Sequence, residues 1–170
     1  WEAGLKYLFP LFAFALGVLI AEQIQHKYKY AKRLHWRQGI LGAEIIILFI
    51  VGFIPQRGNM IATVLVSFAC AMQVQSFRKV NGFSYASTMC IGNLRSGTAA
   101  LSFYLRERRP EQLRQAMYYL GIIVLFAIGA GIGGNLSANY GIHMIWVSCG
   151  LLIVSFLLMF LDIEARRSRA

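Results

Sequence analysis

Long apolar runs separated by short polar segments are the main feature of this sequence. A helix needs roughly 20 mostly apolar residues to cross about 30 Å of hydrocarbon. Runs close to this length predict five transmembrane helices, at 7–23, 39–55, 60–77, 116–136 and 142–162. A sixth region, 83–104, is long enough to cross but much more polar. The pattern predicts an all-α fold: a polytopic bundle of membrane helices forming a single transmembrane domain over residues 1–170.

Composition and charge agree with a membrane protein and exclude a nucleic-acid-binding protein. Of the 170 residues, 58% are hydrophobic and 14% are charged, whereas about a quarter are charged in an ordinary soluble domain. The net charge of +10 comes from Lys and Arg residues that gather in short connections between the apolar runs and in the C-terminal tail. Basic residues in such loops mark the cytoplasmic side of a membrane.

The distribution of charge also predicts the path of the polar region 83–104. If this region enters and leaves the membrane on the cytoplasmic side, 14 Lys and Arg residues lie inside and two outside, with Arg95 within the segment. If it crossed, the arginines of 106–114 and of the tail would lie outside, against the positive-inside rule. We therefore predict a re-entrant segment, broken at Gly92 and Asn93 into two half-helices, and a cytoplasmic C-terminus.

A short repeat links two of the apolar runs. Tyr7, Leu8 and the run Phe14–Gly17 recur as Tyr119, Leu120 and the run Phe126–Gly129, with Ile128 in place of leucine and an offset of 112 residues. The charge-based topology gives the two copies opposite directions, so we expect an inverted repeat, a plan common among secondary transporters. The offset implies that about half a unit precedes Trp1.

Three stretches resemble the YoaK family of bacterial membrane proteins, a family with a domain of unknown function. They are Ala71–Val80, Ser87–Ser96 and Phe14–Gly17. The family usually has threonine where this sequence has Ile91, which removes any role for that hydroxyl here. Its members carry an earlier Thr-Gly-Asn element, so the resemblance implies that this chain lacks its first span and first re-entrant element. It also implies multi-pass residence in the bacterial cytoplasmic membrane, without naming a substrate.

Polar residues at membrane depth are costly and therefore indicate function. A half-helix starting near Asn93 would point unpaired N–H groups at an anion, and Arg95 would add a full positive charge beside it. The alternative is that Arg95 neutralises Glu44 or reaches to the interface. Hydroxyls of Ser96 and Thr98 complete this candidate substrate-binding group.

Three further polar residues are candidates for solute contact. Glu44 lies inside its predicted span. It could bind a proton or a cation or pair with Arg95; the alternative is a carboxylate near the cytoplasmic interface that faces basic loop residues. Gln73 and Gln75 lie near the end of the predicted span 60–77. Their role is either to form hydrogen bonds between helices or to contact the substrate.

The sequence contains no recognisable catalytic motif. The three cysteines and three histidines have no metal-ligand spacing, and no nucleophile stands beside a base. We therefore expect no enzyme activity, no cofactor and no metal, and a secondary transporter or permease for a small polar or anionic solute. The alternative is a non-transporting membrane scaffold or regulator. Expected partners are the lipid bilayer, a small anionic solute, and a second copy of the chain or the missing N-terminal segment; no nucleic acid is expected.

Overall fold

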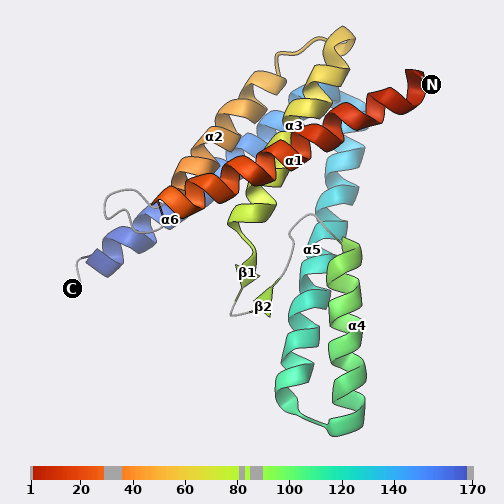
Figure 1. The fold of residues 1–170 in the computed structure, drawn as a ribbon, viewed down its shortest axis with the longest axis vertical. Helices are drawn as coiled ribbons and strands as arrows, with labels where there is room; N and C mark the ends of the chain where they lie inside the picture. Colours follow the sequence, from red (N-terminus) through yellow and green to blue (C-terminus); the bar gives the residue numbers. More distant parts are fainter. Residues whose placement is uncertain (1, 29–35, 81–82, 85–89, 168–170) are drawn as a thin grey trace. The chain divides into compact units, whose positions relative to one another are not determined.

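The structure of the protein is a computed structural model that describes residues 2–28, 36–80, 83–84 and 90–167. Its described residues are almost entirely helical (Figure 1). The chain divides into two compact units, one made of residues 1–76 and 136–170 and the other of residues 77–135. The prediction of an all-α fold is confirmed for the described residues, apart from one short hairpin.

The first unit contains four long helices and two short 3-10 turns. The helices are α1 (Glu2–Tyr28), α2 (Trp36–Val51), α3 (Asn59–Ser76) and α6 (Ile145–Arg167), and the turns are η1 (Gln56–Gly58) and η2 (Gly141–Met144). Helix α3 packs against both α1 and α2, and α2 also packs against α6. The predicted span 39–55 is wrong at its end, because α2 stops at Val51, just before Gly52 and a turn that contains Pro55.

Small residues bring α1 close to α3. Ala13, Gly17 and Ala21 are spaced four residues apart on α1 and are all buried. At Gly17 the backbones approach so closely that an added Cβ would lie 2.6 Å from the carbonyl oxygen of Phe68 and 2.8 Å from Cβ of Ala71. Such small-residue stripes give the packing contacts that hold helices together in lipid, where no hydrophobic force acts between them.

The contacts within this unit also give the directions of its helices. Gly17 lies beside Phe68, and Glu22, further along α1, bonds Gln75, further along α3, so α1 and α3 run in the same direction. Ile40 packs with Met72 near the start of α2, in the same cluster as Ala21.

Helix α2 runs in the opposite direction to its neighbours. Leu48 and Ala69 share the next cluster, so α2 is antiparallel to α3. Ile45 meets Cys149, and Gly52 meets His143, so α2 is also antiparallel to α6. Helices α1, α3 and α6 therefore share one direction, as the ribbon in Figure 1 also shows.

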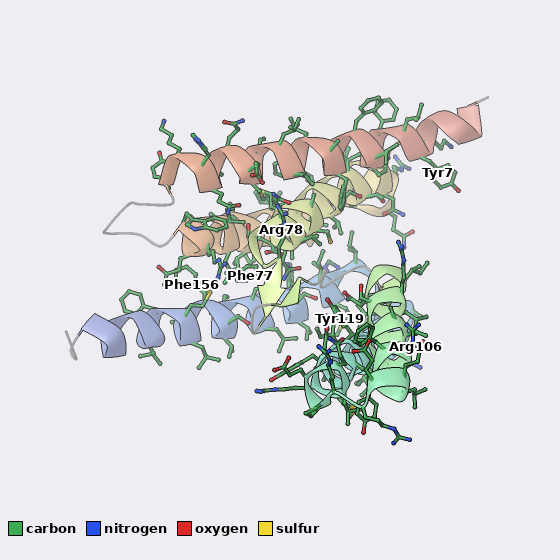
Figure 2. All side chains as sticks on the ribbon, turned by 60° about the horizontal axis from the view of Figure 1, so that its bottom comes forward. Tyr7, Phe77, Arg78, Arg106, Tyr119 and Phe156 are labelled. Atoms are coloured by element: carbon green, nitrogen blue, oxygen red, sulfur yellow. The ribbon has the colours of Figure 1, made fainter. Side chains whose placement is uncertain are left out.

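The second unit is built around a helical hairpin. It contains the short antiparallel strands β1 (Lys79–Val80) and β2 (Phe83–Ser84), helix α4 (Cys90–Glu107), and α5 (Pro110–Tyr140) as far as residue 135. Gly97 of α4 packs on α5. A Cβ added at Gly97 would lie 3.0 Å from Cβ of Tyr119. The Tyr119 side chain accordingly lies on the side of α5 that faces α4 (Figure 2).

A left-handed residue ends α4 and allows α5 to turn back. Arg108 has a φ of 55° and its N–H donates to the carbonyl of Tyr104 at 2.8 Å, which is the bond of an αL helix cap. Pro110 then occupies the first position of α5, where a missing N–H costs nothing. An exposed ion pair of Arg109 and Glu107, at 3.0 Å, adds little stability.

Three helical stretches are long and apolar enough to cross a membrane: Lys6–Tyr28, Gln56–Ser76 and Pro110–Leu161. The third contains both α5 and α6, joined at η2. Their most apolar windows are at most 22% buried within the protein, so most of this apolar surface faces outward. Surface of this kind, on helices of this length, indicates a membrane protein. Helix α2 has 16 residues and a length of about 24 Å, so it falls outside these stretches.

Both copies of the predicted repeat are helical. The first lies in α1 and the second in α5, and the last residues of these helices, Tyr28 and Tyr140, are also 112 residues apart. Shifted by the same offset, α2 falls within α6. The two copies belong to different units, so their inverted relation stays a prediction.

Candidate functional site

The polar segment 83–104 forms a continuous helix in its second half. Helix α4 begins at Cys90 and passes through Gly92 and Asn93 to Glu107 without interruption. The predicted break at Gly92 and Asn93 is therefore wrong; residues 85–89 lie outside the described residues. A glycine in a helix interior costs about 1 kcal/mol, and the contact of Gly97 with α5 outweighs that local preference.

The four candidate residues on α4 point in different directions. Asn93 is buried on the face that also carries Gly97, and Ser96 is half-buried beside this face. Arg95 and Thr98 are exposed within their unit. The structure thus keeps these residues on one stretch of helix, but it does not bring their side chains to a common point.

A shallow open pocket lies between α4 and α5, with a volume of about 350 Å³. Its lining is Ser96, Ala99, Ala100, Phe103, Gln112, Gln115 and Tyr119. A hydroxyl, a phenol and two amides provide both hydrogen-bond donors and acceptors, and the phenyl ring provides an apolar wall. No charged side chain lines the pocket, and Arg95 lies outside it. These groups suit a small polar ligand.

The two glutamines of this pocket were not predicted to be functional. The predicted span began at residue 116, which left Gln112 and Gln115 in a loop. Helix α5 instead begins at Pro110, so both residues lie on a helix, at a spacing of three residues. This spacing puts them on one face with Tyr119, four residues further along. Pro110 followed by a polar turn was the signal in the sequence that could have revealed them.

Gln73 and Gln75 lie near the C-terminal end of α3, in the other unit. The amide nitrogen of Gln75 donates a hydrogen bond to the carboxylate of Glu22 on α1. Hydrogen bonding between helices was the packing role considered for this pair, and for Gln75 it is confirmed. Gln73 is half-buried. Neither residue belongs to the unit that holds Ser96 and its pocket.

Glu44 is the most deeply buried charged side chain in the described part of the chain. It lies on α2 with only 3% of its surface exposed. Among the described residues, its Oε2 atom has no hydrogen-bond partner, and the same holds for Nε2 of Gln38, which is 6% exposed. Glu44 and Arg95 belong to different units, so their pairing stays a hypothesis.

An aromatic cluster joins the end of α2 to the start of α6. Trp146 lies 5.2 Å from Phe53, 6.2 Å from Phe49 and 5.3 Å from His143, measured between ring centroids. Its indole N–H donates to the carbonyl of Phe49 at 3.4 Å, and Nδ1 of His143 donates to the carbonyl of Gly52 at 3.1 Å. Amphipathic rings of this kind gather where a membrane meets water.

Groups for metal binding are not assembled in the described ranges. Within 2–28, 36–80, 83–84 and 90–167, no three His, Cys, Asp or Glu residues are placed to hold a metal ion. Cys70, Cys90 and Cys149 are all free thiols. The described residues offer hydrogen-bonding groups and one buried carboxyl group.

Comparison with known proteins identifies the family and no more specific relative. No curated protein and no solved structure matches the chain. A family model matches residues 1–158, which is most of the sequence. The description of this family gives no function, which agrees with the unknown function implied by the resemblance to the YoaK family. The description does not include the name YoaK. The chain belongs to the family described as Protein of unknown function (DUF1275).

Proposed function

We propose that this protein is a permease for a small polar or anionic solute, with α4 as the element that binds the solute. The observation that supports this function best is the polar pocket that α4 forms with α5, an apolar helix long enough to cross a membrane. Polar side chains at membrane depth face other protein groups or a watery cavity. The pocket lined by Ser96, Gln112 and Gln115 offers such protein groups to a solute that enters between the two helices.

An anion is the ligand that the charge of α4 favours. The first described turn of the helix, from Cys90, lies at the positive end of the helix dipole. Arg95 stands in the next turn with its side chain exposed, and the space beside Gly92 is open. A carboxylate that passes this end of α4 would meet the helix dipole and a guanidinium before it reaches the pocket.

The directions of the helices support a re-entrant α4. Helices α3 and α6 run in the same direction, so the chain between them must cross the membrane once more, or an odd number of times. Helix α5 makes one such crossing, so α4 enters and leaves on the same side. The Lys and Arg distribution supports the cytoplasm as that side and a cytoplasmic C-terminus, and the family resemblance supports a bacterial membrane.

Single-cysteine labelling tests this topology. In a variant without Cys70, Cys90 and Cys149, we expect Glu111→Cys, at the exposed start of α5, to react only from the cytoplasmic side. Arg57→Cys, exposed in η1, is the matched control and should react only from outside. Labelling of both positions by an impermeant maleimide on whole cells would contradict the re-entrant path.

Solute flux tests the proposed function itself. We expect proteoliposomes with the purified protein to take up some member of a panel of small carboxylates and inorganic anions. Arg95→Ala should abolish this uptake while leaving thermal stability unchanged, because the side chain is exposed. Arg95→Lys keeps the charge but loses the planar fork. It should therefore reduce uptake about tenfold, the effect of a hydrogen bond worth about 1.4 kcal/mol.

Arg114→Ala is the matched control for Arg95→Ala. Arg114 is an exposed arginine of α5 whose guanidinium lies 5.8 Å from the ring centroid of Tyr118, and neither residue lines the pocket. Its loss should leave uptake unchanged. Uptake that survives Arg95→Ala would refute the anion site. A folded wild-type protein that moves no solute of the panel would favour the rival function, a membrane scaffold or regulator.

A further inference from the structure

The carboxyl group of Glu44 lies inside the packing of the first unit and does not belong to the lining of the α4 pocket. Helix α2 places it between Leu41 and Leu48, two buried residues on the same helix. The elements that pack against α2 bring the thiols of Cys70 and Cys149 close enough to interact with it electrostatically. Its Oε2 atom has no hydrogen-bond partner among the described residues. A buried acid is thus held by α2 in nearly apolar surroundings.

Among the described residues, the helices that pack against α2 carry basic residues only near their ends. Helix α3 contains no Lys, Arg or His, and the basic residues of α6, Arg166 and Arg167, lie more than four turns beyond Cys149. On α1, the basic residues are Lys6, near its start, and His26 and Lys27, in its last turn. On α2 itself, Arg37 lies seven residues before Glu44, about 10 Å along the axis.

An ionised carboxylate in such a place is costly. An unpaired charge in an apolar interior costs many kcal/mol, so the group neutralises by binding a proton or a cation. A metal cation needs several ligands, oxygen atoms for Ca²⁺ and Mg²⁺ and thiolates or imidazoles for Zn²⁺, and no three His, Cys, Asp or Glu residues among the described ones are grouped to hold one. A proton needs only the carboxylate itself. The surroundings of Glu44 therefore select a proton.

We infer that Glu44 is a proton-binding site inside the membrane bundle. The carboxylate binds one proton in the packed state and releases the same proton when α2 opens toward water. Gln38, a buried amide with an unpartnered Nε2 atom, lies about 9 Å nearer the start of α2 and provides a hydrogen-bonding group on the way out. If the protein is the permease proposed above, on which this step rests, proton binding at Glu44 couples solute movement to a proton gradient.

Chemical labelling tests the proton site without any transport assay. Hydrophobic carbodiimides react with protonated carboxyl groups buried in apolar surroundings. In the purified protein, we expect dicyclohexylcarbodiimide to modify Glu44, and the extent of modification to fall as the pH is raised. Glu44→Gln, a neutral group of the same shape, should remove this label, whereas Glu22→Gln, at an exposed carboxylate, should not. Peptide mass spectrometry that finds the wild-type Glu44 unmodified at every pH would overturn the inference.

Flux measurements then test the coupling. With the solute that the wild type moves, we expect an imposed pH gradient to drive uptake in the wild type and in Glu22→Gln, and this response to be lost in Glu44→Gln. An unchanged response in Glu44→Gln would overturn the coupling. The two proposals fail separately: pH-dependent labelling of Glu44 in a protein that moves no solute would refute the permease and leave the proton site standing.

Discussion

Gly17→Leu is expected to force α1 away from α3 and to lower the free energy of unfolding. Even the first carbon of the new side chain would lie 2.6 Å from the Phe68 carbonyl oxygen and 2.8 Å from Ala71. Neither neighbour is the flexible end of a side chain, so the helices themselves must shift. Overpacking of a well-packed interface costs about 1–3 kcal/mol, and we expect the upper end of this range.

Thermal unfolding in detergent, followed by circular dichroism, measures this loss. Gly17→Ala should produce a smaller decrease in stability in the same direction, because it adds the clashing carbon and nothing beyond it. Gly39→Leu is the matched control, since Gly39 is exposed on α2 and a Cβ there meets nothing within 4 Å. Leucine favours helix formation over glycine by up to about 1 kcal/mol, so the control should be neutral or slightly stabilising. Equal losses at both positions would contradict the close α1–α3 contact.

The sequence located the helices of this protein well, because a membrane imposes a length on every apolar run. Each of the five predicted spans corresponds to a helix, although α2 ends earlier than predicted and α5 begins earlier. The partners of each helix could not be predicted in the same way. The stripe of Ala13, Gly17 and Ala21 is visible in the sequence, but only the fold reveals that it packs on α3.

The candidate site was predicted less completely, and the reason differs between residues. At Gly92 and Asn93, a local preference for a break was overruled by packing of the rest of α4 on α5. Gln112 and Gln115 were missed because the boundaries of helices are the least certain part of a sequence pattern. The carboxyl of Glu44 was recognised as unusual from its position in an apolar run, but only the fold shows that its Oε2 atom has no hydrogen-bond partner among the described residues.

Gly52→Ala is expected to disrupt the aromatic cluster at the junction of α2 and α6. A Cβ at residue 52 would lie 2.0 Å from Nε1 of Trp146, so the indole must move. That movement breaks the hydrogen bond from Trp146 to Phe49 and its ring contact with His143, at 3.4 Å and 5.3 Å. A neutral hydrogen bond and an aromatic contact are each worth about 1 kcal/mol, so a loss of about 1–3 kcal/mol is expected.

A double-mutant cycle identifies the cause of that loss. In a Trp146→Ala background, the ring that clashes is absent, so Gly52→Ala should become nearly neutral and the coupling energy should account for most of the single-mutant effect. Gly150→Ala, at an exposed glycine of α6 where a Cβ meets nothing within 4 Å, is the matched control and should not lower the unfolding temperature. If Gly52→Ala destabilises the protein equally with and without the indole, the loss does not come from Trp146, and α6 does not dock on α2 through this contact.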